Sequence, residues 1–254
     1  MTALHLARHA AGGDPVLLLL HGLGATGEVW HELLERGWPG EVLAPDLPGH
    51  GRSPRLDEYT FEAMAASVAS VLPAGRPVVV LGHSLGGVLA LTLAAGSYGV
   101  VAACGLGIKL RWSAEELERA AGVAARPERV FATREEAVDR WLRVSGLAGL
   151  VPPSSPLVGP GVVAGDDGWR VAVDPRAFGV GAPDVPSLLA RASCPTVLAA
   201  GERDPMCPRE HLLAVSPTAT LLAGVGHNAH VEDPSTLWPL LDRLHADVDN
   251  HPVG

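Results

Sequence analysis

The chain is poor in cysteine, with three in 254 residues: Cys104, Cys194 and Cys207. An odd and sparse set does not make a disulfide framework, and no two of these cysteines have the Cys-x-x-Cys spacing of a zinc or redox site. A chain of this length buries enough surface to fold without a disulfide or a metal staple. We therefore expect no metal site.

Positive charge and long apolar runs are also scarce. The chain has 19 Lys and Arg against 28 Asp and Glu, for a net charge of −9. It thus lacks the basic footprint of a general nucleic-acid binder, and anionic membrane surfaces should not attract it. Apolar runs such as residues 16–20 are far shorter than the ~20 residues of a membrane-spanning helix. Residues 1–11 lack the apolar centre of a signal peptide.

These absences predict a cytoplasmic protein whose partners include neither nucleic acid nor a membrane. The sequence leaves its oligomeric state open.

What the sequence does contain is a regular alternation of short apolar runs with amphipathic stretches. The runs predict strands at residues 4–8, 16–20, 42–44, 78–81, 100–104, 196–200 and 220–222. The stretches predict helices at residues 28–36, 60–72, 84–95, 208–215 and 234–246. Because strand–helix alternation builds crossover units, we expect an α/β fold with a mainly parallel central sheet flanked by helices.

The alternation breaks after Gly107. Residues 108–186 predict two helices and a turn, at 114–121, 135–142 and 166–168. Thr133 and Glu136 have the spacing of a capping box at the start of the second helix. We therefore expect a mostly helical cap insertion at 108–186, which interrupts an α/β core. The core would consist of residues 1–107 and 187–254.

Residues 82–86 read Gly-His-Ser-Leu-Gly and match Gly-x-Ser-x-Gly between an expected strand and an expected helix. At such an elbow the serine backbone is strained, and side chains two residues to either side would collide, so Gly82 and Gly86 have none. The helix that begins here points its N-terminus at the reaction centre, where it stabilises developing negative charge. Ser84 is therefore the candidate nucleophile.

A serine hydroxyl needs a general base, and the base needs a group that orients it. Asp204 follows the expected strand at 196–200, and His227 follows the expected strand at 220–222. In open α/β sheets, sites form at the carboxyl ends of the strands. We therefore expect Asp204 and His227 to meet Ser84 there.

Other residues compete for both roles. His230 is a rival for the base, but His227 directly follows the glycine after the strand. Asp166, Asp167 and Asp174 also precede His227, yet they lie in the insertion with no expected strand before them. Asp204 and His227 remain the favoured pair.

Taken together, these pieces resemble the α/β-hydrolase fold family. The resemblance is carried by Leu-His-Gly-Leu-Gly at 20–24, Asp-Leu-Pro-Gly-His-Gly-Arg-Ser at 46–53, Gly-His-Ser-Leu-Gly-Gly at 82–87, Gly-Glu-Arg-Asp at 201–204, Gly-His at 226–227 and Glu-Asp-Pro at 232–234. It implies a catalytic nucleophile at Ser84, an acid at Asp204 and a base at His227. It also implies oxyanion-hole N–H groups from Leu23 and Leu85, and a cap over the site. The insertion matches no subfamily pattern, so the substrate stays open.

The resemblance implies a serine hydrolase that cleaves a small to medium carboxylic ester or a related acyl substrate through an acyl-enzyme on Ser84. No metal or organic cofactor is needed for that chemistry. The same triad also serves lactone, thioester and some carbon–carbon bond hydrolases. Trp112, Trp141 and Trp169 lie in the insertion and either pack the cap on the core or line an apolar substrate pocket.

Two hypotheses from other classes remain. The fold also serves as a non-catalytic receptor for small ligands. In addition, residues 22–27 form a literal Gly-x-Gly-x-x-Gly, with Asp46 at the end of the next expected strand. That is the fingerprint of a dinucleotide-binding site. A nucleotide site would leave Ser84, Asp204 and His227 without a role.

Overall fold

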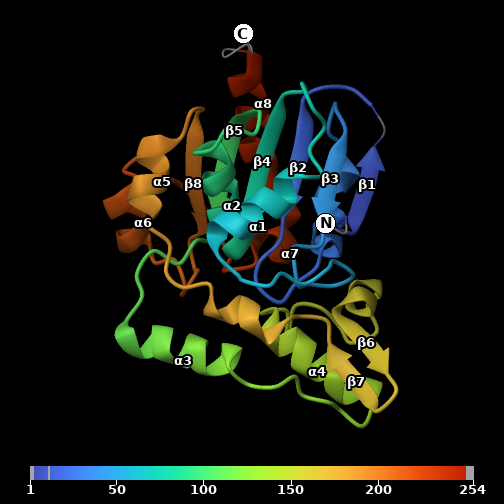
Figure 1. Ribbon diagram of the computed structural model, residues 1–254. Coiled ribbons are helices and arrows are strands. Elements are labelled where there is room, and N and C mark those ends of the chain that lie inside the picture. Colours follow the sequence, from blue (N-terminus) through green and yellow to red (C-terminus); the bar gives the residue numbers. More distant parts are fainter. Residues whose placement is uncertain (1–2, 11, 250–254) are drawn as a thin grey trace.

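A seven-stranded sheet forms the centre of the molecule (Figure 1). The structure is a computed structural model and describes residues 3–10 and 12–249. Strand β1 is antiparallel to β3, and every other neighbouring pair in the order β1-β3-β2-β4-β5-β8-β9 is parallel. The strands are β1 Leu6–Ala10, β2 Val16–Leu20, β3 Val42–Pro45, β4 Val78–His83, β5 Val100–Leu106, β8 Thr196–Gly201 and β9 Thr220–Leu222. The mainly parallel sheet predicted from the sequence is confirmed.

Both faces of this sheet are buried, which is why its central strands read as unbroken apolar runs. In β2, Leu17 and Leu19 belong to one hydrophobic cluster, whereas Leu18 and Leu20 belong to another. Successive side chains of a strand point to opposite faces, so each cluster fills one face.

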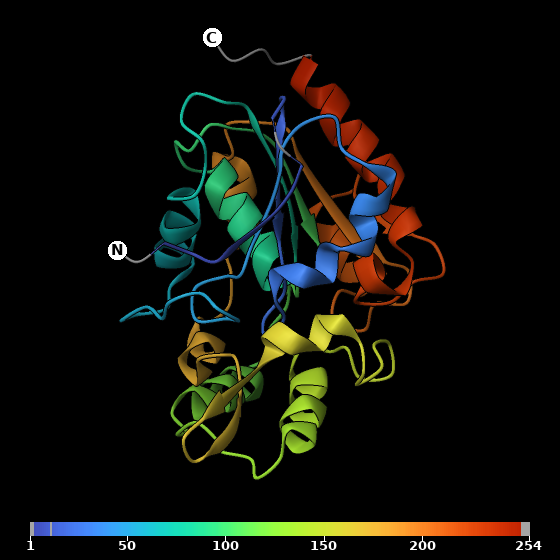
Figure 2. The same cartoon turned by 90° about the vertical axis from the view of Figure 1, so that its right-hand side faces the viewer.

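Helices cover both faces of the sheet (Figure 2). Met64 of α1 and Leu89 of α2 pack in the cluster on one face, and Leu244 of α8 packs in the cluster on the other. The helices of this layer structure are α1 Phe61–Ala69, α2 Leu85–Ala94, α5 Val185–Arg191, α6 Arg209–Val215, α7 Ala229–Glu232 and α8 Trp238–Asp249.

One predicted helix of the core differs. Residues 28–36 form two short 3₁₀ helices, Gly27–Trp30 and Glu32–Arg36, instead of one α-helix. Trp30 ends the first of these helices and Leu33 lies in the second, and both pack in the same hydrophobic cluster, where each is almost fully buried.

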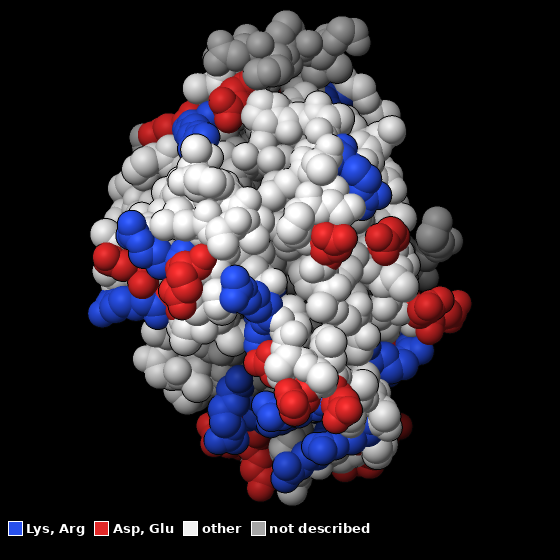
Figure 3. Space-filling model, turned by 90° about the vertical axis from the view of Figure 1, so that its left-hand side faces the viewer, with Lys and Arg blue, Asp and Glu red and all other residues white. Residues whose placement is uncertain are grey.

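Residues 107–184, which we call the β5–α5 segment, leave the sheet and lie beyond the carboxyl ends of its strands (Figures 1 and 2). The segment contains α3 Ala114–Ala124, α4 Arg134–Val144, β6 Val162–Gly165, β7 Gly168–Val171 and the 3₁₀ helices Pro156–Gly161 and Pro175–Gly179. On the face in Figure 3, charged side chains of both signs are densest over this segment.

The β6–β7 hairpin is a departure from the expected mostly helical insertion. Gly165 pairs with Gly168, so Asp166 and Asp167 form a two-residue loop at the predicted turn. Only one residue of β6 and none of β7 is buried, so neither strand has the buried apolar run by which the sheet strands are recognised. At the other end, α5 begins at Val185, so the predicted boundary at 186 falls in the first turn of that helix.

Side-chain caps set the starts of α3 and α4. Ser113 and Glu116 form a complete capping box at α3. At α4, Thr133 accepts from the Glu136 N–H, but the Glu136 carboxylate accepts from the Ala132 N–H instead of the Thr133 N–H. The predicted capping box is therefore only half formed.

A buried carboxylate ties the β5–α5 segment to the core. Asp174 accepts a hydrogen bond from the Tyr59 hydroxyl at 3.0 Å and pairs with the Arg176 guanidinium at 2.7 Å. Its backbone N–H donates to the Gly49 carbonyl at 2.7 Å, and Gly51 donates to Ala172 at 2.8 Å. Burial alone would raise the pKa of Asp174, but the hydrogen bonds from Arg176 and Tyr59 lower it, so the carboxylate stays ionised in this joint.

Two buried histidines brace the core loops beside the sheet's carboxyl edge. His21 Nδ1 lies 2.8 Å from the Gly22 carbonyl, and its Nε2 accepts from the Leu47 N–H at 2.8 Å, so the ring is neutral. His50 Nδ1 lies 3.0 Å from the Pro48 carbonyl. Burial lowers the pKa of His21 to about 4 and that of His50 to about 3.

Within residues 3–10 and 12–249, no helix is both long and apolar enough to cross a bilayer. The three cysteines are free thiols.

Because the folded-state pKa of His50 is about 3, below the ordinary value of 6.5, its contribution to stability is complete above pH 6.5. It is lost progressively as the pH falls, since the unfolded chain then binds a proton that the folded chain refuses. Between pH 6 and 4 the unfolding free energy of the native chain should fall with decreasing pH. We predict that the slope of this fall is smaller in His50→Asn by about 1.4 kcal/mol per pH unit, which corresponds to the uptake of one proton. Urea unfolding of both chains across that range measures it, and parallel curves would contradict the burial of a neutral ring.

Candidate active site

Ser84 lies on a sharp turn between β4 and α2. Its backbone has φ 52° and ψ −114°, and it is the one non-glycine residue with positive φ in the described ranges. Its N–H donates to the Leu106 carbonyl at 2.7 Å. Such a conformation costs about 1–3 kcal/mol and is held only by its surroundings.

The two glycines of the elbow are sterically required. A Cβ on Gly82 would lie 2.0 Å from the Gly86 carbonyl oxygen, and one on Gly86 would lie 2.2 Å from the Leu20 carbonyl oxygen. Both contacts are with backbone, which cannot move aside without distorting the sheet. The collision expected from the sequence is therefore present.

Asp204 and His227 are hydrogen-bonded to each other at the ends of β8 and β9. His227 Nδ1 lies 2.9 Å from Asp204 Oδ2. The other carboxylate oxygen, Oδ1, accepts from the backbone N–H groups of Met206 at 2.7 Å and Cys207 at 3.2 Å. The Asp204 side chain is fully buried, while that of His227 is 21% exposed. With Nδ1 bound to the carboxylate, Nε2 is the ring nitrogen left for chemistry.

Two residues that the sequence analysis did not assign hold the loop around His227. Both oxygens of Glu232 accept backbone N–H bonds, from Gly226 at 2.7 Å and Asn228 at 3.1 Å. His83 Nε2 lies 2.9 Å from the His227 carbonyl oxygen and donates to it. The sequence signal for Glu232 was its place in the Glu-Asp-Pro piece, and that for His83 was its place inside the elbow motif.

His230 occupies a different environment from His227. Its ring is buried between Trp30 and His83, with ring centroids 4.5 Å from each. Burial, with a smaller contribution from His227, lowers the pKa of His230 to about 3. The structure thus brings Asp204 together with His227, and it leaves His230 in a stack of neutral rings behind it.

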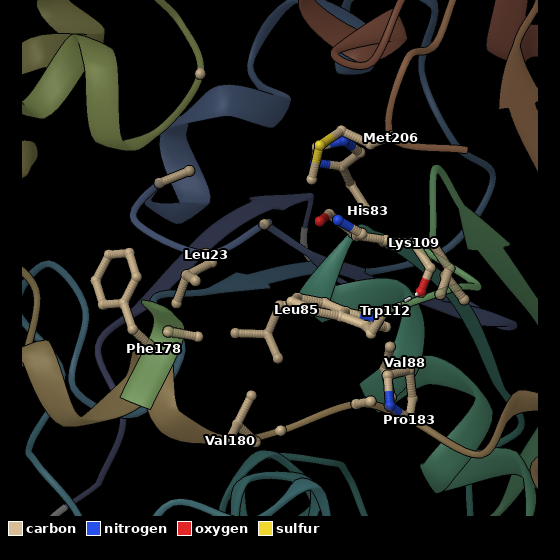
Figure 4. Close-up of a pocket in the computed structure, with 18 of the residues that line it drawn as sticks. Leu23, His83, Leu85, Val88, Lys109, Trp112, Phe178, Val180, Pro183 and Met206 are labelled. Atoms are coloured by element: carbon tan, nitrogen blue, oxygen red, sulfur yellow. Dashed lines mark hydrogen bonds between the residues drawn. The ribbon is translucent and has the colours of Figure 1, made fainter. Parts of the chain in front are cut away.

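A cavity of about 630 Å³ lies between the core and the β5–α5 segment, and we call it the site cavity. Ser84 and His227 both line it. Its walls are mostly apolar, and Figure 4 shows several of these side chains. They include Leu23, Leu85, Val88, Phe178, Val180, Pro183 and Met206. Among the described residues that line it, Lys109 and Arg143 are the basic ones, and none is an Asp or a Glu.

The structure places Leu23 and Leu85 on the wall of this cavity beside Ser84. Leu85 is the first residue of α2, so its N–H has no carbonyl partner within the helix. Leu23 follows His21 and Gly22, whose positions the His21 ring fixes. Both N–H groups are on segments that the fold holds in place.

The three tryptophans of the segment lie in different environments. Trp112 lines the site cavity, and its Nε1–H donates to the Lys109 carbonyl at 3.1 Å. Trp141 is fully buried in the hydrophobic core cluster, and Trp169 exchanges backbone hydrogen bonds with Phe131. Neither Trp141 nor Trp169 is among the residues that line the site cavity, because both side chains pack in or against the hydrophobic core cluster.

Gly107 is a further residue that the site requires. It has φ +63°, and a Cβ there would lie 3.3 Å from Asp204 Oδ2 and 3.4 Å from His227 Nδ1. A side chain would therefore both strain the backbone and crowd the hydrogen-bonded Asp204 and His227.

The glycine pattern at 22–27 does not form a nucleotide site of the expected kind. Asp46, which would have to bind a ribose, is buried, and its two oxygens accept from the backbone N–H groups of Gly27 at 2.8 Å and Arg52 at 2.9 Å. Its carboxylate thus shapes two core loops. Across the described residues, no cluster of three or more His, Cys, Asp or Glu has the arrangement of a metal site.

The sequences of known proteins match this chain over part of its length. Lipase LipV of Mycobacterium tuberculosis is 40% identical over 102 residues, which are 39% of each chain. A pimeloyl-[acyl-carrier protein] methyl ester esterase of Neisseria meningitidis is 45% identical over 80 residues, 30% of this chain and 24% of that one. The matches therefore span less than half the length of both relatives.

Comparison at the level of structure and family covers far more of the chain. The thioesterase domain from the curacin biosynthetic pathway has a TM-score of 0.73 at 24% identity, over 93% of this chain and 94% of that one, which shows a shared fold. The model of the alpha/beta hydrolase family matches residues 17–238. With its parallel sheet, serine elbow and family match in agreement, the chain belongs to the alpha/beta hydrolase family.

Proposed function

We propose that this protein is a serine hydrolase that cleaves a small to medium carboxylic ester or related acyl substrate through an acyl-enzyme on Ser84. The observation that carries the proposal is the buried Asp204–His227 hydrogen bond of 2.9 Å beside a cavity that Ser84 also lines. In acyl transfer, an imidazole oriented by a carboxylate acts as the general base that activates a serine hydroxyl on the same cavity.

In this mechanism His227 Nε2 takes the Ser84 proton as the oxygen attacks the substrate carbonyl. Asp204 keeps the proton on Nδ1 and stabilises the imidazolium that forms. The N–H groups of Leu23 and Leu85 bind the oxyanion. In serine hydrolases the loss of one such donor typically lowers the rate about 10²–10³-fold. His227 then protonates the leaving alcohol, and water cleaves the acyl-enzyme by the same route.

The lining of the site cavity supports an acyl group of modest size with apolar character. The β5–α5 segment supplies more than half of the lining residues, including Trp112 and the stretch from Phe178 to Pro183, so it would act as the cap over the bound substrate. Related proteins are named as a lipase, a methyl ester esterase and a thioesterase domain, which agrees with acyl transfer from oxygen or sulfur. Lactones, thioesters and some carbon–carbon bonds remain alternatives on the same triad.

A non-catalytic receptor is the alternative from another class. It has no need for the strained backbone of Ser84 or for the three hydrogen bonds on the Asp204 carboxylate. These features stabilise a reactive arrangement and add nothing to the binding of an apolar ligand, so they favour the enzyme.

We predict that a small fluorophosphonate adds once to the native chain, with the adduct on Ser84, as measured by intact mass. Ser84→Ala should abolish the adduct and lower ester turnover by roughly 10⁴–10⁶. His227→Ala should slow labelling strongly because the hydroxyl loses its base. A panel of esters, lactones and thioesters then ranks the leaving groups.

His230→Phe is the matched control, because it keeps an aromatic ring between Trp30 and His83 and removes a titrating group. It should label at close to the native rate. Rapid labelling of His227→Ala together with slow labelling of His230→Phe would overturn the assignment of the base. A folded native chain that neither labels nor turns over any substrate of the panel would favour the receptor.

A second prediction uses Gly107. Gly107→Ala should lower kcat/KM by roughly tenfold to a hundredfold, since small displacements of catalytic groups have effects of that size. Gly75 has a similar φ of +73° with no atom within 4 Å of an added Cβ, so Gly75→Ala introduces the same strain far from the site. Both variants should lose about 1 kcal/mol of unfolding free energy. Equal kcat/KM for the two would show that Gly107 does not protect the acid–base pair.

A further inference from the structure

A second groove, of about 280 Å³, lies in the β5–α5 segment and is lined by four arginines. Arg126 and Arg129 follow α3, Arg140 lies on α4, and Arg170 lies on β7, so they converge from three separate parts of the segment. Between them the lining is mainly apolar, with Val123, Phe131, Val144, Val171, Val173 and Phe178. We call it the arginine groove.

The positive charge of this groove is only partly neutralised. Its one acidic lining residue, Glu128, pairs with Arg55 and lies 3.9 Å from Arg170. Arg170 also pairs with Asp167 at 2.5 Å. Arg126 and Arg140 are exposed and make no ion pair within the described part of the chain. In a chain with a net charge of −9, cations without partners around an apolar floor form a local field that attracts anions.

The Arg129 side chain is held in place by a neighbouring ring. Its guanidinium carbon lies 4.8 Å from the centre of the Phe131 ring. Stacking on an aromatic ring leaves the N–H edge of a guanidinium available for oxygen ligands. The groove therefore offers N–H donors at its rim and hydrocarbon contact on its floor.

The groove is next to the site cavity. Val144 and Phe178 line both, so the two spaces are adjacent along these side chains. On α4, Arg140 lines the groove, and Arg143, less than one turn further along, lines the site cavity. Cations thus lie on both sides of Val144 and Phe178, and none of the described residues that line the cavity is an Asp or a Glu.

We propose that the arginine groove binds the anionic end of the substrate, a phosphate or a carboxylate, while the acyl centre lies at Ser84. This inference rests on the proposed function and names its substrate class: an amphiphilic acyl compound with a hydrocarbon part and an anionic terminus. Guanidinium groups bind both kinds of oxyanion through paired N–H donors. Arg126 and Arg140 supply the binding charge, and Phe178 and Val144 contact the hydrocarbon next to it.

The kinetic test compares methyl esters that differ only at the far end. The set contains the methyl esters of ω-hydroxy acids, the same esters phosphorylated at the ω-hydroxyl, and the monomethyl esters of dicarboxylic acids of matching length. Each kind is tested at several chain lengths. The double variant Arg126→Gln/Arg140→Gln removes two groove arginines that make no ion pair in the described part of the chain, so it leaves no carboxylate stranded. It should raise KM for the anionic esters at least about tenfold, with kcat and the hydroxy esters little changed. The phosphate and carboxylate arms decide which oxyanion is preferred.

The charge-matched control is Arg119→Gln/Arg209→Gln, which removes two exposed arginines that line neither the groove nor the cavity. Its KM for the anionic esters should stay within about twofold of native. A native chain that does not prefer anionic esters over hydroxy esters would overturn the proposal. So would an equal change in KM for both double variants, since that would reflect net charge alone.

A binding measurement separates this proposal from the proposed function. Calorimetry of octyl phosphate and of octanol with the Ser84→Ala chain needs no turnover. Octyl phosphate should bind at least about tenfold more tightly than octanol, and Arg126→Gln/Arg140→Gln should remove that difference. Equal binding of the two compounds would refute the groove even if the esters are cleaved. Selective binding with no fluorophosphonate labelling of the native chain would refute the hydrolase and keep the groove.

Discussion

The buried carboxylate of Asp204 is the constraint on which the arrangement of the site depends. A charge removed from water is costly unless hydrogen bonds replace its hydration. Two backbone N–H groups and the His227 ring do so here, and together they fix where the imidazole can lie. The Glu232 carboxylate and the His83 ring then hold the backbone around His227. The imidazole is thus oriented before any substrate arrives.

The remaining structure places Ser84 and the site cavity beside this pair. The elbow at Ser84 is strained, and the glycines at 82 and 86 permit it because any Cβ would strike backbone. Asp174 joins the β5–α5 segment to the core through Tyr59, and Arg176 does so through the carbonyls of Leu56 and Asp57. Under the proposed function the core would supply the chemistry, and the segment would limit which substrate fits beside it.

The sequence predicted those features whose signal is local. The parallel sheet followed from apolar runs, and the meeting of Asp204 with His227 followed from their places after neighbouring strands. The hydrogen bond from His83 to the His227 carbonyl could not be read in the same way, because it depends on where a side chain inside the elbow motif points. The β6–β7 hairpin was missed because only one residue of its two strands is buried, so neither strand has the buried apolar run that marks the central sheet. The different positions of Trp112 and Trp141 depend on packing, which composition does not encode.

The central claim is that Ser84 carries the acyl group in a covalent intermediate. It is tested most directly by partitioning: esters with one acyl group and different leaving alcohols are turned over in water that contains methanol. A common acyl-enzyme predicts one ratio of methyl ester to free acid for every leaving group, even where the rates of alcohol release differ. A ratio that changes with the leaving group would show that water attacks the substrate directly, and it would contradict the account.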